Sequence, residues 1–163
     1  MSLDWGRFLP AAAFAVLLLI AAAFDIRERR IPNWTVLALI AVFLVAAILG
    51  FAPQAWLPSL GALAIALAGT GVLYRFGALG AGDSKLFSAA ALFLGIGNLA
   101  MLTCATAIAG GLLAVGFLIF RTKPATAPGR AEEDKAGVPY GVAIAIGGLA
   151  TAAYARVLWP QPV

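Results

Sequence analysis

Two aspartates stand at the edges of apolar segments, where a pair of carboxylates could hydrolyse a peptide bond. Asp25 directly follows the apolar residues 21–24, and Asp83 lies three residues before an apolar segment that begins at Leu86. Two carboxyl groups that lie close together cannot both ionise easily, so such a pair holds a single proton. One carboxylate can then activate water while its protonated partner polarises the scissile carbonyl.

The other residue types exclude several competing chemistries. The chain contains no histidine, which excludes a histidine-based triad and a histidine-ligated zinc site. Its single cysteine, Cys104, lies inside an apolar segment, so neither a disulfide framework nor a cysteine-ligated metal site can be built. The remaining acidic residues are Asp4, Glu28, Glu132, Glu133 and Asp134.

Each of the two aspartates also has a purely structural interpretation. Asp83 could cap the helix that follows it by accepting backbone N–H bonds. Asp25 could pair with Arg29, four residues later, or mark a helix end. The sequence gives no distance between the two carboxylates, so their proximity is an inference from the expected topology.

The composition requires a lipid environment. Of the 163 residues, 63% are hydrophobic and 11% are charged, whereas a soluble domain has about 45–50% apolar and about 25% charged residues. We therefore expect an all-α, polytopic membrane protein with one membrane-embedded domain over residues 1–163. The net charge of +4 does not indicate nucleic-acid binding, because the basic residues lie between apolar segments rather than on one soluble face.

Six apolar segments predict six transmembrane helices, at 8–24, 34–51, 57–76, 86–97, 99–120 and 140–158. Residues 86–120 form a run of 35 residues without a charge. As one helix this run would be about 52 Å long, too long for a hydrocarbon core of about 30 Å. The turn-forming residues 95–98 therefore predict its division into a short fourth and a longer fifth helix.

The positive charges predict the orientation. Lys and Arg concentrate in cytoplasmic loops, and six spans place nine of the eleven basic residues on one side: Arg27, Arg29, Arg30, Arg75, Lys85, Arg121, Lys123, Arg130 and Lys135. Both termini then lie outside the cytoplasm, while Asp25 and Asp83 lie at the cytoplasmic boundary. Residues 121–138 are rich in Ala, Pro, Gly and charge, which predicts a flexible cytoplasmic loop.

The sequences around the two aspartates resemble a known family. Residues 80–86 read GAGDSKL, a GxGDxK motif, and residues 25–34 read DIRERRIPNW, in which a basic stretch and Ile-Pro-Asn precede the second span. Together with the number and order of the spans, these motifs resemble the type IV prepilin peptidases, which are GxGD intramembrane aspartyl proteases, and in particular their short Tad/Flp-pilus type. Residues 139–143, which read PYGVA at the start of the last span, also resemble that group.

The resemblance implies that Asp25 and Asp83 form the catalytic pair of an endopeptidase that needs no metal and no organic cofactor. It implies a prepilin substrate with a short basic leader ending in Gly, followed by an apolar helix that enters the bilayer. We expect cleavage at the cytoplasmic face of a bacterial inner membrane, with local unwinding of the substrate helix beside the GxGD segment. Larger members carry an N-terminal zinc-binding domain and also methylate the new N-terminus. This chain begins nearly at its first span, so we expect proteolysis without methylation.

Other residues are candidates for supporting roles. Gly80 and Gly82 could take turn conformations or let a substrate strand approach closely, although an ordinary turn between helices would also use them. Lys85 could attract the carboxylates or extend to the lipid headgroups. The candidate substrate contacts are Glu28, Pro139, Tyr140 and Gly141, of which Gly141 could instead permit close helix packing. The acidic residues 132–134 could contact a basic leader or simply be solvated.

Other functions would also place aspartates at the membrane edge. A preflagellin peptidase is a related alternative. A small proton-coupled transporter could use the two residues as a relay, and a non-enzymatic assembly subunit could use them only as caps. Substitution of either aspartate separates these possibilities, because a peptidase would lose leader removal whereas a scaffold would tolerate both changes.

Overall fold

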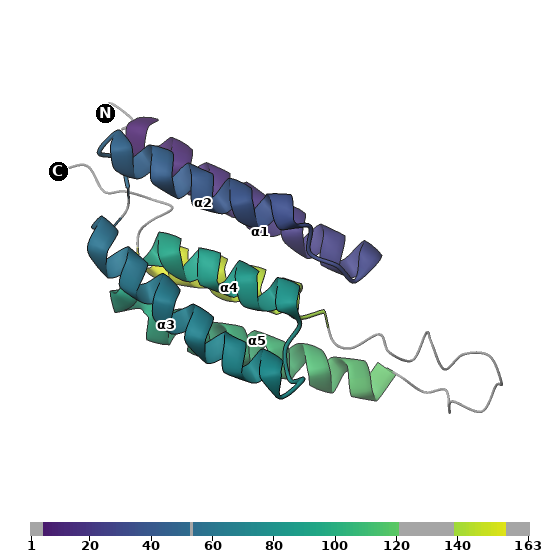
Figure 1. Ribbon diagram of the computed structural model, residues 1–163. Helices are drawn as coiled ribbons and strands as arrows, with labels where there is room; N and C mark the ends of the chain where they lie inside the picture. Colours follow the sequence, from purple (N-terminus) through teal and green to yellow (C-terminus); the bar gives the residue numbers. More distant parts are fainter. Residues whose placement is uncertain (1–4, 53, 121–138, 156–163) are drawn as a thin grey trace.

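The chain folds into six α-helices and one short 3₁₀ turn, described in a computed structural model for residues 5–52, 54–120 and 139–155 (Figure 1). In chain order the elements are α1 (Trp5–Glu28), α2 (Asn33–Ile48), α3 (Trp56–Arg75), α4 (Ala81–Leu94), η1 (Ile96–Asn98), α5 (Leu99–Phe120) and α6 (Tyr140–Tyr154). No strand occurs in these residues. The predicted all-α, polytopic membrane fold with six helices is confirmed.

The division of the long charge-free run is also confirmed, and Gly95 causes it. Gly95 ends α4 with a φ of +77°, a conformation that side chains with a Cβ rarely adopt. η1 follows directly, and the Asn98 side-chain amide donates a hydrogen bond to the Leu94 carbonyl oxygen at 2.8 Å. The chain therefore reverses before α5 instead of continuing as one helix.

The boundaries near the two aspartates differ from the predicted spans. α1 continues past Asp25 to Glu28, and α4 already begins at Ala81, so Asp83 lies inside the first turn of its helix. An acidic residue in a first turn is favoured by the partial positive charge of a helix N-terminus, which accounts for the earlier start. The predicted flexible loop at 121–138 lies outside the described residues.

A glycine-dependent turn leads from α3 into the GxGD segment. Gly77 has a φ of +72°. Its N–H donates to the Tyr74 carbonyl oxygen and the Ala78 N–H donates to that of Leu73, both at 2.9 Å, which is the Schellman pattern of helix ends. Gly80 has an ordinary extended conformation, with φ −72° and ψ 151°. Gly77, rather than Gly80 of the GxGD motif, therefore takes the turn conformation between α3 and α4.

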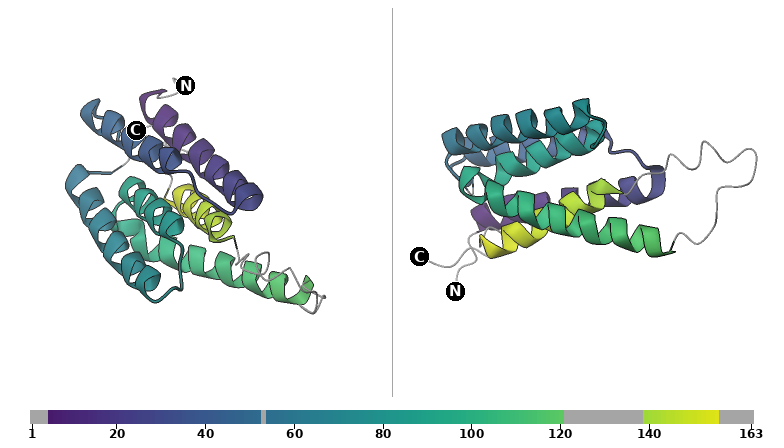
Figure 2. Two further views of the ribbon diagram at one scale, coloured as in Figure 1. Left: turned by 45° about the vertical axis from the view of Figure 1, so that its right-hand side comes forward. Right: turned by 90° about the horizontal axis from the view of Figure 1, so that it is seen from below.

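The helices pack around α4. α4 and α6 lie between the pair α1 and α2 on one side and the helices α3 and α5 on the other (Figure 1), and Figure 2 shows α6 running between α1 and α5. Ten of the fourteen residues of α4 are buried. Phe93 of α4 stacks on Phe14 of α1, with ring centroids 4.4 Å apart, and meets Phe43 of α2 edge-on at 6.3 Å. α4 is therefore covered by protein along most of its length.

The outer surface is apolar, as a lipid environment requires. Large side chains such as Leu37, Ile48 and Leu118 are exposed by 65%, 83% and 75%. Within the described parts of the chain, three segments are long and apolar enough to cross a membrane: Phe8–Glu28, Trp56–Arg75 and Ile96–Ile119. Asn33–Ile48 and Tyr140–Tyr154 are shorter apolar helices. At 14 residues, α4 is shorter than a full span, and helices rather than lipid cover most of it.

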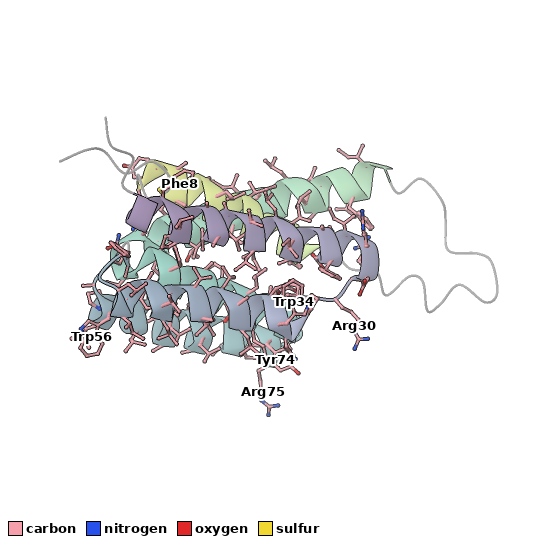
Figure 3. The ribbon with its side chains drawn as sticks, turned by 90° about the horizontal axis from the view of Figure 1, so that it is seen from above. Phe8, Arg30, Trp34, Trp56, Tyr74 and Arg75 are labelled. Carbon is pink, nitrogen blue, oxygen red and sulfur yellow. The ribbon has the colours of Figure 1, made fainter. Side chains whose placement is uncertain are left out.

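The two aspartates lie toward the same end of the bundle. α1 ends there, α4 begins there, and α6 begins there (Figures 1 and 2). Figure 3 shows Arg30 and Arg75 toward this end and Trp56 toward the opposite one. In the described residues, the basic side chains after α1, at the end of α3 and at the start of α4 thus gather at the aspartate end.

Candidate active site

Asp25 is held in the last turn of α1 against the start of α6. Its side chain is only 7% exposed. Oδ2 accepts a hydrogen bond from the Gly141 backbone N–H at 2.8 Å, and the Val142 N–H also interacts with this carboxylate. The first amides of a helix have no partner inside it. The Asp25 carboxylate therefore accepts a hydrogen bond from an otherwise unpaired backbone amide at the N-terminus of α6, a helix that is distant in the sequence.

Asp83 is the third residue of α4, and Gly80 is the residue that caps this helix. The Gly80 N–H hydrogen-bonds to the Asp83 carboxylate, so the side chain reaches back to the cap as the acidic member of a capping box does. Asp83 is half-buried. The simple N-cap interpretation of Asp83 is wrong, because Gly80 occupies that position, but Asp83 does contribute to the helix start.

The carboxylates of Asp25 and Asp83 lie close enough to repel each other electrostatically. They come from two separate helices, α1 and α4, between which α2 and α3 lie in the sequence. Arg29 attracts the Asp25 carboxylate, and its guanidinium lies over the Phe117 ring of α5 at 5.7 Å from the centroid. The structure thus places two carboxylates and one arginine at the basic end of the bundle.

The motif glycines permit close approach at this site. A Cβ at Gly80 would lie 2.7 Å from Oδ2 of Asp83. A Cβ at Gly82 would lie 3.2 Å from the Cβ of Ile31, in the connection between α1 and α2. The first turn of α4 is therefore packed directly against the segment that follows the Asp25 helix.

Lys85 and Glu28 are both exposed at the same end. The Lys85 ammonium donates to Oδ1 of Asn33 at 3.3 Å, which ties α4 to the first residue of α2. Glu28 is the last residue of α1. Asn33 follows Pro32, which caps α2 with a φ of −65° rather than forming its first turn.

The three candidate substrate contacts at the start of α6 have different surroundings. Pro139 caps the helix. The Tyr140 ring lies against Gly110 of α5, where a Cβ would be 3.5 Å from Cε1. Gly141 is buried and contacts Asp25. Tyr140 and Gly141 thus join α6 to α5 and α1 respectively.

A pair of buried hydroxyls next to Asp83, on Thr70 and Ser84, was not among the predicted site residues. Ser84 and Thr70 are both buried and their hydroxyl oxygens lie 2.7 Å apart. Ser88 donates to the Ser84 carbonyl oxygen at 2.8 Å. The available signal was the presence of Thr70, Ser84 and Ser88 in otherwise apolar helices, because a polar group buried among helices needs a hydrogen-bond partner.

The site combines two carboxylates with backbone amides, and it can perform the acid–base chemistry of a carboxyl pair. Each carboxylate receives at least one backbone N–H. In the described part of the chain, no three His, Cys, Asp or Glu side chains gather in a group that could hold a metal ion.

Comparison with known proteins identifies the family. Residues 12–115 match the type IV leader peptidase family. No curated protein and no solved structure was found to match the chain. Because the family match covers more than half of the 163 residues and includes both Asp25 and Asp83, this membrane protein belongs to the type IV leader peptidase family.

Proposed function

We propose that the protein is an aspartic endopeptidase that removes the basic leader of type IV, Flp-like prepilins, with Asp25 and Asp83 as its catalytic pair. The observation that carries this proposal is that α1 and α4 bring Asp25 and Asp83 to one end of the bundle, near enough for the two carboxylates to act on each other electrostatically. The family match supports a leader peptidase, and the GxGDxK and Ile-Pro-Asn motifs support the Flp-type substrate.

The proposed hydrolysis uses one proton held between the two carboxyl groups. The ionised carboxylate takes a proton from water as the water oxygen bonds to the scissile carbonyl carbon. The protonated partner gives its proton to the carbonyl oxygen, which yields a tetrahedral diol. When the C–N bond breaks, the first group returns its proton to the leaving nitrogen and the second takes one from a diol hydroxyl. The products are a carboxylic acid and an amine, and the pair is restored.

We propose that this reaction occurs at the cytoplasmic face of a bacterial inner membrane. A basic leader remains in the cytoplasm while the apolar helix behind it lies in the bilayer, so the scissile bond is at the boundary. The charge pattern supports this side, because Arg30 and Arg75 lie toward the aspartate end and cytoplasmic loops are rich in such residues. Both termini then lie outside the cytoplasm. The substrate helix must unwind beside residues 80–83, since a helical peptide bond is hydrogen-bonded and poorly accessible.

Glu28 is our candidate for recognising the basic leader. Among the described residues it is the exposed acidic side chain at the aspartate end, whereas Asp25 is buried and Asp83 half-buried. The alternative contacts, Glu132 to Asp134, lie outside the described residues. Glu28→Gln should raise KM for a basic leader and leave kcat unchanged.

Processing of a co-expressed prepilin tests the proposal. Asp25→Asn and Asp83→Asn should each abolish leader removal while the protein remains in the membrane. Thr103→Ala, which changes an exposed residue of α5, should process normally. Intact processing in both Asn variants would overturn the peptidase assignment, and a pH-dependent solute flux that both variants lose would instead favour a transporter. Faster processing of a preflagellin than of the prepilin would overturn the substrate assignment alone.

We further propose that the protein does not methylate its product. The mature pilin released in the presence of S-adenosylmethionine should then have the mass of an unmodified N-terminal amine. A product heavier by one methyl group would contradict this.

A further inference from the structure

The start of α6 supplies hydrogen-bond donors to Asp25, although this helix lies outside the family match at residues 12–115. Pro139 is the cap and Tyr140 the first helical residue, so the Gly141 N–H is one of the first amides and has no acceptor in its own helix. It points to Oδ2 of Asp25 at 2.8 Å. Both partners are buried.

We propose that Gly141 is a positioning residue of the peptidase. Its N–H holds Oδ2 of Asp25, with the Val142 N–H as a second donor to the same carboxylate, so that the carboxyl group keeps one orientation toward the attacking water. A carboxyl group rotates about its Cβ–Cγ bond unless one oxygen is held, and a fixed orientation is what proton transfer requires. This inference rests on the proposed role of Asp25 in peptide hydrolysis.

The contact distances explain why this position needs a glycine. A Cβ at Gly141 would lie 2.8 Å from Oδ2, 2.9 Å from Cβ and 3.0 Å from Cγ of Asp25. These atoms belong to a short side chain on a helix, so they cannot swing away as the end of a long side chain can. A larger residue would therefore push either Asp25 or α6 out of place and lengthen the hydrogen bond.

Two other glycines of α6 show that this role differs from simple packing. A Cβ at Gly148 would meet Cδ1 of Leu18 at 2.8 Å, the far end of a flexible side chain on α1. A Cβ at Gly147 would meet Thr106 of α5, including its backbone nitrogen at 2.7 Å. Gly148 shares its helix pair with Gly141 but touches no carboxylate. Gly148→Ala is therefore the matched control.

The charged groups that act on Asp25 in the described residues are Arg29, directly after α1, and Asp83 of α4. Removing one N–H from Asp25 would weaken the support of its ionised form without changing either neighbour. The acidic limb of the pH–rate profile should then move to higher pH. A glycine that served only to let the helices pack would not produce this shift.

The decisive variant replaces Gly141 with glycolic acid, which exchanges the N–H for an ester oxygen and adds no Cβ. Loss of one hydrogen bond to a charged group predicts a fall in kcat of about 10- to 100-fold, with KM for the prepilin unchanged. Because the bond is buried between α1 and α6, the melting temperature should fall as well. Gly141→Ala should also lower kcat, and Gly148→Ala should retain it.

The outcomes separate this inference from the proposed function. Wild-type kcat and an unshifted pH profile in the ester variant would overturn the positioning role while leaving the peptidase assignment intact. A lower melting temperature with a proportional change in KM would make Gly141 a packing residue, which also overturns the role. Absence of cleavage by the wild-type protein, or full activity of Asp25→Asn, would instead overturn the proposed function.

Discussion

The hydroxyl oxygens of Thr70 and Ser84 lie 2.7 Å apart and join α3 to α4 immediately after Asp83. Thr70 Oγ1 also lies 2.7 Å from the Ala66 carbonyl oxygen, to which it donates. Because a threonine hydroxyl has a single proton, Ser84 must be the donor between the two side chains. This bond fixes the first turn of α4, on which Asp83 stands.

Thr70→Val should therefore weaken both the fold and the reaction. The substitution keeps the shape of residue 70 but leaves the buried Ser84 hydroxyl without its acceptor. Hydrogen bonds between membrane helices contribute about 0.6 kcal/mol on average and about 1.7 kcal/mol at most, so we expect a loss of unfolding free energy in that range. Unfolding in detergent micelles and prepilin cleavage measure the two effects.

A double variant distinguishes a hydrogen bond from simple packing. Thr70→Val combined with Ser84→Ala removes both polar groups, so it should cost less than the sum of the single changes. Thr103→Ala is the matched control, because Thr103 is exposed and its hydroxyl bonds only to its own helix, at the Leu99 carbonyl oxygen 2.8 Å away. Strict additivity of the Thr70 and Ser84 changes would contradict the assignment.

Cleavage should depend on pH with an optimum between two limbs. Neighbouring carboxyl groups lose their protons in two separate steps. Below the first step both Asp25 and Asp83 are protonated and no base remains, whereas above the second step both are ionised and no acid remains. The chain has no histidine that could produce either limb. The measurement is cleavage of a histidine-free prepilin in liposomes across the pH range, and a rate that rises steadily into the alkaline region would contradict the paired mechanism.

The helix number and the division at Gly95 could be predicted because they depend on local properties. Apolar length indicates the number of helices, and the turn-forming residues 95–98 indicate where the long charge-free run divides. The start of α4 at Ala81 also had a local signal in the acidic Asp83 of the first turn. The apolar segment itself begins only at Leu86, five residues after the first residue of α4.

The contacts that complete the site could not be predicted in the same way. Gly141 and Asp25 are 116 residues apart, and no periodicity or composition connects a backbone amide with a distant carboxylate. The motif PYGVA indicated that the start of the last span is special, but it did not indicate which neighbour Gly141 meets. The Thr70 and Ser84 pair likewise depends on the relative rotation of α3 and α4, which the apolar pattern leaves open.

Phe93→Ala should destabilise the bundle without touching the site. The Phe93 ring is fully buried between Phe14 and Phe43. In soluble cores the loss of such a ring costs about 3–5 kcal/mol. Because unfolded membrane helices remain in lipid, the transfer part of this cost is small, and we expect about 1–3 kcal/mol from lost contacts. Leu118→Ala, at a position that is 75% exposed, should leave the unfolding free energy nearly unchanged, and equal losses in both variants would contradict the core assignment.

Gly80→Ala should lower kcat because the added methyl group would collide with the Asp83 carboxylate. The backbone of Gly80 suits alanine, with φ −72° and ψ 151°, so no backbone strain opposes the change. The new Cβ would lie 2.7 Å from Oδ2 of Asp83 and would displace that carboxylate. A shift of roughly 1 Å in a reacting group costs up to about 100-fold in rate, so we expect a fall in kcat of about 10- to 100-fold.

Gly82→Ala provides the matched comparison for this change, two residues further along the same motif. Its Cβ would approach the Cβ of Ile31 at 3.2 Å, and Ile31 lies in a connection that can yield by a few tenths of an ångström. Alanine inside a helix is also favoured over glycine by about 0.5–1 kcal/mol. We therefore expect near-normal kcat and unchanged or higher stability for Gly82→Ala. If Gly82→Ala lost as much activity as Gly80→Ala, close packing of the whole motif, rather than the position of the Asp83 carboxylate, would explain the glycines.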